Sequence, residues 1–276
     1  MPEYILGARG HDYGRGNVKE IFGRMKRGGW NCTQLAFKKL VAGVTTYADV
    51  TPEVVAEVQD AIKEVQLEVA VLGTYVELGA LDTEKRKQEV ADFISQIPVC
   101  KALGASCIAS ETTYFDSGND TVTREEALRE LLKSLEEIMP EAERQGVTVA
   151  LEPVWFHTMD TVETTRMVID CIKSPNLKII FDPANLLSPK WLNRQDELYY
   201  RAVESWGSLI AAVHFKGVHR IEEGYHPCSL QASVVEYKAV FNALKAVPQK
   251  KLPLLREEAV PEHAKQDQEF IQSFFM

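Results

Sequence analysis

Four apolar runs in the second half of the chain each end in a side chain that can bind a metal. The runs are VTVALEP, LKIIFDP, LIAAVHFK and LPLLREE, and their polar ends are Glu152, Asp182, His214 and Glu257. A repeat of about 30 residues fits one strand, one helix and two loops. Parallel strands in such a series would bring the four side chains to one rim, where β/α barrels carry their active sites.

Strand-like and helix-like segments alternate over the whole chain, which predicts a β/α fold. The expected strands are continuous apolar runs, as in a parallel sheet covered by helices. They are 4–8, 30–36, 68–76, 105–111, 147–153, 177–183, 209–216 and 252–258. The clearest expected helices are 52–65, 83–103, 124–145, 162–173, 195–206, 233–246 and 261–275. Eight strand–helix pairs favour a closed (β/α)8 TIM barrel, a single domain over residues 1–276, above an open doubly wound sheet.

Several residues predict where individual helices begin and end. Thr51 precedes Pro52, and Asp82 lies three positions before Lys85, which are N-terminal capping patterns. Gly104 and Gly146 fall where the third and fourth helices should stop.

The composition excludes several classes of protein. A net charge of −9 and a pI near 5.3 argue against broad binding to nucleic acid or anionic membranes. No apolar run is long enough to span a bilayer, and MPEYILGARG lacks a signal-peptide pattern. The five scattered cysteines, never spaced CxxC, indicate reduced thiols in the cytoplasm. We therefore expect a cytoplasmic protein with a small-molecule partner; a homo-oligomer is compatible with this sequence.

Two glutamates, one aspartate and one histidine form a hard, mostly oxygen ligand set. Such a set suits Mn²⁺ or Mg²⁺, while the imidazole also admits Co²⁺, Fe²⁺ or Zn²⁺. The eighth strand offers both Glu257 and Glu258. Strand alternation favours Glu257, because an inward Glu258 would also turn Arg256 into the barrel.

The pattern LEP, FDPAN, VHFK and LREE resembles the xylose isomerase-like TIM barrels, a superfamily of sugar phosphate isomerases and epimerases that includes ketose 3-epimerases and apurinic endonucleases. KALGAS and LGTY extend the resemblance over nearly the whole chain. In the epimerase branch it implies that Glu152, Asp182, His214 and Glu257 bind the metal. It also implies that Glu152 and Glu257 are the catalytic acid/base pair.

The chain departs from this superfamily at positions that bear on function. The third and fourth strands, EVAVLGTYV and ASCIASE, lack the histidines that bind extra zinc ions in the endonucleases. Asn185 stands three residues after Asp182, where the endonucleases have histidine. A trinuclear zinc site and phosphodiester cleavage are therefore not expected. In ketose epimerases the position of Asn185 is commonly a histidine that contacts substrate, and the amide of Asn185 can still bind a hydroxyl.

Further polar and aromatic residues are expected around the barrel mouth. His157 should lie on the loop above the metal, and Trp155 beside it could form an aromatic wall for a sugar face. Lys216, His219 and Arg220 form a basic cluster suited to a phosphate or carboxylate. The remaining substrate-binding candidates are His11 and Glu111, with Gln34 and Tyr75 as weaker ones.

The favoured reaction is isomerisation or epimerisation of a small sugar, sugar phosphate or keto-sugar through an enediolate. One glutamate would remove a carbon-bound proton and the other would return a proton. The same site could instead serve a metal-dependent lyase or dehydratase, for example one that cleaves C-glycosides, with His157 as base. A barrel that binds sugar without turnover is the alternative from another class.

Overall fold

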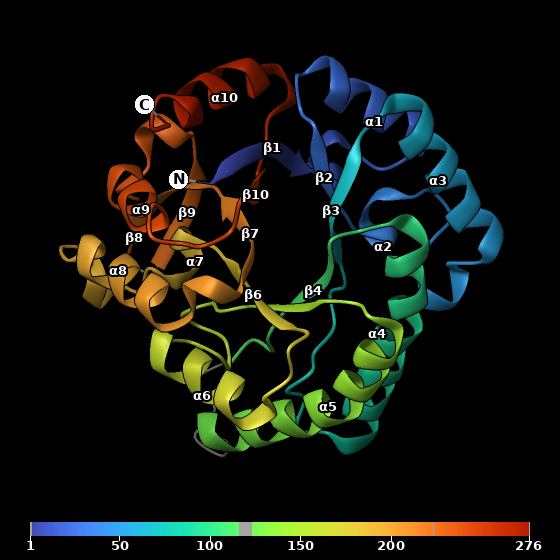
Figure 1. The fold of residues 1–276 in the computed structure, drawn as a ribbon, viewed down its shortest axis with the longest axis horizontal. Helices are drawn as coiled ribbons and strands as arrows, with labels where there is room; N and C mark the ends of the chain where they lie inside the picture. The colour runs from blue at the N-terminus through green and yellow to red at the C-terminus, as the bar shows by residue number, and fades with distance from the viewer. Residues whose placement is uncertain (1, 116–122, 223, 276) are drawn as a thin grey trace.

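The computed structural model describes residues 2–115, 123–222 and 224–275, and it contains a closed barrel of eight parallel strands (Figure 1). This confirms the predicted (β/α)8 TIM barrel. Helices surround the barrel, and β1 and β10 close it by pairing in parallel. The strands are β1 (Glu3–Arg9), β2 (Cys32–Leu35), β3 (Glu68–Gly73), β4 (Cys107–Glu111), β5 (Val149–Glu152), β6 (Leu177–Phe181), β7 (Ile210–Phe215) and β10 (Lys251–Arg256).

The helices agree with the sequence pattern except near the C-terminus. The last two are shorter than expected: α9 begins only at Tyr237, and a 3₁₀ turn at Pro261–His263 replaces the first turn of α10. The helices are α1 (Val18–Arg27), α2 (Phe37–Leu40), α3 (Pro52–Val65), α4 (Thr83–Leu103), α5 (Arg124–Gln145), α6 (Val162–Ile172), α7 (Pro183–Leu186), α8 (Gln195–Trp206), α9 (Tyr237–Leu244) and α10 (Ala264–Gln272).

The expected helix caps are present. The Thr51 hydroxyl accepts a hydrogen bond from the amide of Val54, and the Asp82 carboxylate accepts one from Lys85 at 2.7 Å. α4 ends at Gly104 with φ 65°, a left-handed conformation that glycine adopts at little cost.

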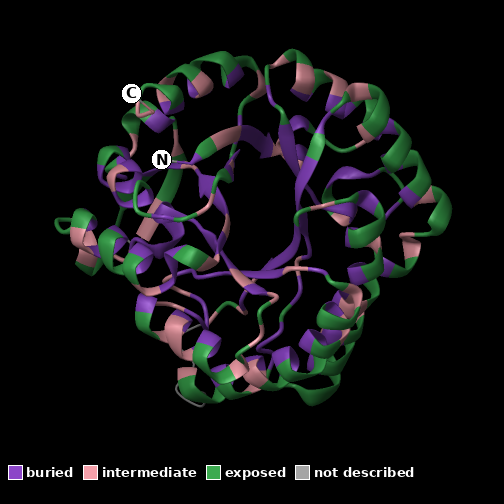
Figure 2. Cartoon of the chain, viewed as in Figure 1, coloured by how far each residue is buried: buried purple, intermediate pink, exposed green. Residues whose placement is uncertain are grey.

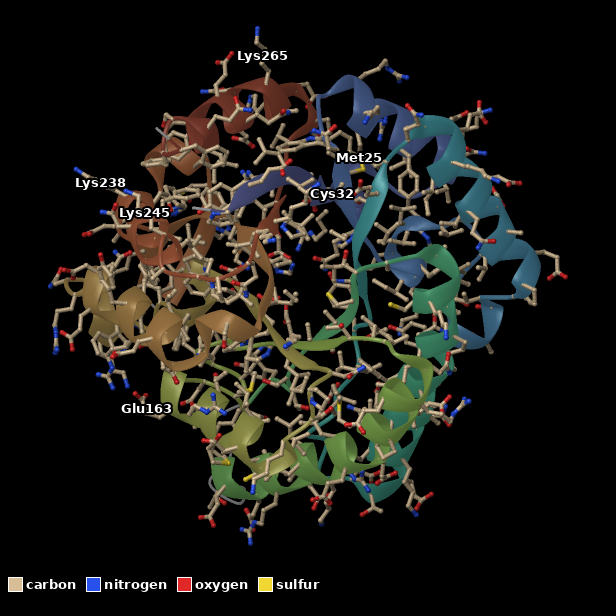
Figure 3. The ribbon with its side chains drawn as sticks, viewed as in Figure 1. Met25, Cys32, Glu163, Lys238, Lys245 and Lys265 are labelled. Atoms are coloured by element: carbon tan, nitrogen blue, oxygen red, sulfur yellow. The ribbon has the colours of Figure 1, made fainter. Side chains whose placement is uncertain are left out.

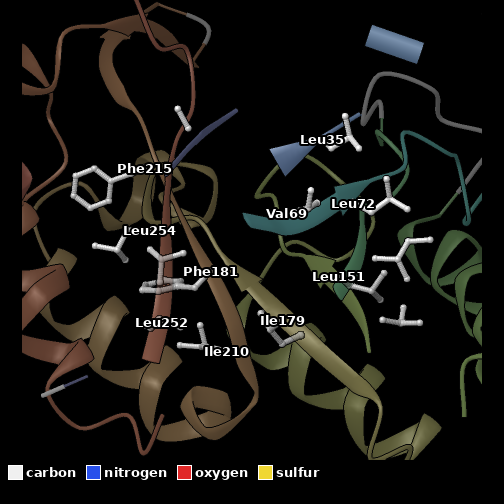
Figure 4. Close-up of a cluster of buried hydrophobic side chains, with 14 of the residues drawn as sticks. Leu35, Val69, Leu72, Leu151, Ile179, Phe181, Ile210, Phe215, Leu252 and Leu254 are labelled. Carbon is white, nitrogen blue, oxygen red and sulfur yellow. The ribbon is translucent and has the colours of Figure 1, made fainter. Parts of the chain in front are cut away.

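Alternation along each strand divides the core into two parts. Outward side chains such as Leu151, Ile179 and Leu254 pack under the helices (Figure 4). Inward side chains such as Ala150, Ile180 and Leu255 fill the barrel axis. Figure 2 shows the buried strands at the centre and the exposed outer faces of the helices. The axis is tightly filled, because a Cβ on Gly7 would lie 2.3 Å from the carbonyl oxygen of Cys32.

A two-stranded hairpin interrupts the seventh repeat, between its strand and its helix, which the sequence pattern did not predict. β8 (Gly217–Ile221) follows β7 after one residue and pairs antiparallel with β9 (Gly224–Cys228). The hairpin lies beside α8 and α9 (Figure 1). It therefore adds side chains to one side of the barrel mouth.

None of the helices within the described ranges is long and apolar enough to cross a membrane.

Candidate active site

Each strand of the barrel ends in one residue that continues its inward-facing series. Two positions earlier, the inward residues on seven strands belong to the apolar axial core. The layer above them faces the mouth of the barrel, where the C-terminal strand ends meet. Apart from Gly73, its members are polar: Arg9, Gln34, Glu111, Glu152, Asp182, His214 and Glu257.

Three members of this layer converge closely enough to hold one metal ion. Glu152, His214 and Glu257 each offer a ligand atom, and these atoms lie within 4.8 Å of one another. Nδ1 of His214 lies 2.9 Å from Oε2 of Glu152 and 3.3 Å from Oε1 of Glu257. All three side chains are buried. His214 and Glu257 come from the paired strands β7 and β10, and Glu152 reaches them from β5, across β6.

Asp182 joins this group through Lys216. The ammonium of Lys216 lies 3.0 Å from Oδ2 of Asp182 and 3.0 Å from Oε2 of Glu257. The other oxygen of Asp182 accepts hydrogen bonds from the amides of Ala184 and Asn185, which fixes the carboxylate as the N-cap of α7. Lys216 therefore supplies positive charge among the candidate ligands in the absence of a metal.

The register of β10 places Glu257, and not Glu258, in the cluster. Leu255 faces the barrel axis, while Arg256 points outward and pairs with Asp267 of α10 at 2.8 Å. Glu258 has a left-handed φ of 54° and turns away to pair with Arg9 at 2.7 Å.

The protonation of the cluster reflects mutual pairing of buried charges. Burial alone would raise the pKa of Glu257, but Lys216, His214 and Arg9 outweigh it and hold that pKa well below its usual range. Burial alone would lower the pKa of His214, but Glu152 and Glu257 raise it to about 9. The metal-free cluster is thus a balanced set of cations and anions.

The buried polar atoms of the cluster suit a divalent ion. Oδ2 of Asp182 and Nδ1 of His214 make ion-pair contacts with Lys216 and Glu152, but no hydrogen bond of good geometry to any described residue. A ligand that satisfies such buried atoms is favourable. Two glutamates, an aspartate and an imidazole match the ligands of Mn²⁺, Mg²⁺ or Zn²⁺. Glu152, Asp182, His214 and Glu257 would hold the ion, and Lys216 would have to yield its place.

The predicted substrate-binding residues beside Glu152 lie around the cluster. The Asn185 amide donates to Oε1 of Glu152 at 2.5 Å, which orients that carboxylate. Glu111 pairs in register with Glu152, and burial, with Glu152 and Glu257 nearby, raises the pKa of Glu111 to about 7. Nε2 of His157 lies 3.8 Å from the Glu111 carboxylate, and its buried Nδ1 has no hydrogen bond to any described residue.

An aromatic pocket opens next to the metal cluster. It has a volume of about 360 Å³ and is lined by Trp155, Asn185, Lys216 and Tyr225, among others. The rings of Trp155 and Tyr225 stand edge to face with centroids 6.4 Å apart. Tyr225 lies on β9, so the hairpin completes the wall. Aromatic faces of this kind suit the C–H face of a sugar.

The basic cluster expected after the seventh strand is divided in the structure. Lys216 is paired with carboxylates of the metal cluster, whereas His219 and Arg220 lie on the exposed end of β8. Sequence reasoning missed Arg9, which contacts Glu257 at 3.6 Å. The position of Arg9 could have indicated this, because Arg9 is the last residue of the first strand, as Glu152 is of the fifth.

The buried imidazole of His157 should make the fold sensitive to acid. Burial, with Lys216 and Arg124 nearby, lowers the pKa of His157 to about 4 from 6.5. Between these values the folded protein binds fewer protons than the unfolded chain, so stability falls as pH falls through this window. The unfolding free energy of His157→Gln should therefore fall less on acidification than that of the unmodified protein, by up to roughly 3 kcal/mol. Urea unfolding at pH 7 and pH 4.5 would measure it.

The exposed His263 supplies the control for this experiment. His263→Gln should keep the pH dependence of the unmodified protein. If His157→Gln also keeps it, protonation of the buried imidazole does not limit acid stability.

The chain belongs to the xylose isomerase-like TIM barrel family, whose sequence profile matches residues 22–274. No curated protein sequence matches it significantly. Among solved structures, the chain resembles 3-keto-D-glucoside 4-epimerase YcjR from E. coli, with a TM-score of 0.76, 17% identity and coverage of 98% of this chain and 100% of that one.

Two further solved structures have the same fold. The IOLI protein, crystallised with a zinc atom, aligns with a TM-score of 0.74 and 16% identity over 98% of this chain and 96% of that one. The probable 3-DHS dehydratase AsbF from Bacillus anthracis aligns with a TM-score of 0.71 and 15% identity over 99% of each chain. At this identity the likeness establishes the fold, and the reaction must be argued from the site.

Proposed function

We propose that the protein is a metal-dependent isomerase or epimerase that acts on a small sugar or keto-sugar through an enediolate. The observation that carries this proposal is the convergence of Glu152, His214 and Glu257, with ligand atoms within 4.8 Å of one another. A sugar epimerase among the related folds supports the same class of reaction. Mn²⁺ is the metal we expect, and the free cysteines fit a cytoplasmic location.

A divalent ion bound here would polarise adjacent carbonyl and hydroxyl oxygens of the substrate and stabilise the enediolate charge. The protein's own groups would move the proton. Glu152 and Glu257 lie on strands β5 and β10, which are separated in the barrel by β6 and β7. They therefore approach a central substrate from different sides, as removal of a proton on one face and return on the other requires.

The neighbours of the two carboxylates support these roles. Asn185 holds one oxygen of Glu152 and leaves the other directed at His214. Glu257 is approached by Arg9 at 3.6 Å, a contact that does not depend on Lys216. Both carboxylates are thus positioned before substrate arrives, which reduces the reorganisation needed for proton transfer.

A lyase or dehydratase is the second candidate. His157 favours it, because burial lowers its pKa to about 4 and keeps the ring neutral and able to accept a proton at pH 7. The His157 ring lies on the same side of the mouth as Glu111, 3.8 Å from its carboxylate. In this reaction the enolate would expel a leaving group instead of being reprotonated.

Proton exchange in deuterated water tests these functions together. The Mn²⁺-loaded protein would be incubated with ketoses, keto-sugars and their phosphates, and products would be followed by NMR after removal of the metal. Deuterium at the carbon next to the carbonyl, with a new epimer or isomer, is the expected result. A product that has lost water or an aglycone would instead establish the lyase, and absence of metal-dependent exchange with every substrate would contradict the proposed isomerase or epimerase.

A further inference from the structure

The side of the mouth formed by the first three strands contains a polar cluster that the proposed chemistry does not use. Nε2 of Gln34 donates to the hydroxyl of Tyr75 at 3.2 Å. The His11 ring stands edge to face against the Tyr75 ring at 6.0 Å. The ammonium of Lys39, on α2, lies 3.2 Å from the centre of the same ring. We call these four residues the β1–β3 cluster.

Two buried atoms of this cluster lack partners. Gln34 is only 5% exposed, yet its carbonyl Oε1 has no hydrogen bond to any residue that the structure describes. Within the same ranges, the buried Nδ1 of His11 also lacks one. Gly73 makes room for the Gln34 amide, since a Cβ there would lie 3.0 Å from its Nε2. An unsatisfied amide carbonyl in the polar layer is a ready acceptor for a ligand hydroxyl.

Lys39 differs from the other cations of the mouth. Arg9 pairs with Asp12 and Glu258, and Lys216 pairs with Asp182 and Glu257. Within the described part of the chain, Lys39 has no carboxylate in ion-pair range and rests only on the Tyr75 ring. Its charge therefore remains available for an anion.

The β1–β3 cluster shares the mouth with the metal cluster. Gln34 pairs in register with Arg9 of the neighbouring strand β1, and Arg9 lies 3.6 Å from Oε1 of Glu257. Gln34 thus lies in the same layer of strand-end side chains as the metal cluster. A single ligand held at the candidate metal centre would extend toward Gln34 and Lys39.

We propose that the β1–β3 cluster binds the end of the substrate remote from the metal, and that this end carries an anionic group paired with Lys39. Gln34 and His11 would bind hydroxyls beside that group. This inference rests on the proposed function and narrows its substrate class to acidic sugars, in which the anion is a carboxylate or a phosphate. The ammonium would form a charge-assisted hydrogen bond with either group.

Binding of three related ketoses tests the proposal without requiring turnover. Isothermal titration of the Mn²⁺-loaded protein would compare D-fructose, D-fructuronate and D-fructose 6-phosphate. We expect at least one acidic sugar to bind about tenfold or more tightly than fructose, the gain typical of a hydrogen bond to a charged group. Preference for fructuronate would identify a carboxylate, and preference for the phosphate would identify a phosphoryl group.

Variants assign the preference to Lys39. Lys39→Met should remove the preference and Lys39→Arg should retain it. Lys38→Met is the matched control, because Lys38 is the adjacent lysine and lies over Tyr47 instead, 4.1 Å from that ring centre. It should keep the preference. Equal affinities for neutral and acidic sugars, or a preference that survives Lys39→Met, would overturn the proposal. So would a preference lost in Arg220→Met but kept in Lys39→Met.

Deuterium exchange in the same samples separates this inference from the proposed function. Lys39-dependent binding without exchange would contradict the isomerase or epimerase and support the subsite. Exchange without any preference for acidic sugars would support the isomerase or epimerase and contradict the subsite.

Discussion

Glu152→Gln is expected to lose substrate deuterium exchange by about 10²–10⁴-fold while it still binds metal, because general-base transfer contributes about this factor. The amide keeps an oxygen that can face the ion but cannot accept the proton. Exchange would be followed by NMR at saturating Mn²⁺, with bound metal measured in each sample. Normal exchange by metal-loaded Glu152→Gln would show that Glu152 is not the base, and His157 would then be tested.

Asp182→Asn is the matched comparison, because Asp182 is a candidate ligand without a proposed proton-transfer role. We expect it to lose metal affinity first and to recover exchange in part when Mn²⁺ is raised. If the two variants exchange substrate deuterium at the same rate at saturating Mn²⁺, loss of a metal ligand alone explains both defects.

Lys216→Met is expected to destabilise the metal-free protein by about 3 kcal/mol, and divalent metal should restore most of the loss. Its ammonium is the close partner of both Asp182 and Glu257, and removing one member of a buried charge pair typically costs about 3–5 kcal/mol. A bound ion would neutralise the same carboxylates. Chemical unfolding with EDTA and with Mn²⁺ would measure the difference.

Lys238→Met controls for the loss of a lysine, since Lys238 is exposed on α9 (Figure 3). It should change stability little in either condition. If Lys216→Met is equally stable with and without metal, or if Mn²⁺ stabilises it no more than the unmodified protein, Lys216 and the metal do not compensate the same charges.

Much of the fold could be predicted because local signals agree with the tertiary structure. The bounds of α3, α4, α5 and α8 match the expected helices, since caps such as Thr51 and Gly104 coincide with the ends of apolar patterns. The orientation of Glu257 followed from strand alternation. Leu255 points into the barrel and Arg256 points outward, so Glu257 points inward again.

The structural features that the sequence did not predict depend on the paths of loops and of long side chains. The β8–β9 hairpin has short, mostly exposed strands, so it lacks the apolar pattern of the barrel strands. Lys216 follows the seventh strand as a loop cation would, and only the structure shows its ammonium between two carboxylates. The β1–β3 cluster combines Gln34 of β2 with residues that follow the first three strands, and no spacing in the sequence reveals that Gln34 and Lys39 meet at Tyr75.

The most direct test of a metal centre in this barrel is a crystal structure of the protein with Mn²⁺, with the ion located by anomalous scattering. We predict one strong peak bound by Glu152, Asp182, His214 and Glu257 at about 2–2.5 Å, with Lys216 displaced from its present position. A peak elsewhere, no peak at saturating Mn²⁺, or these four side chains more than about 6 Å from a shared centre would contradict it.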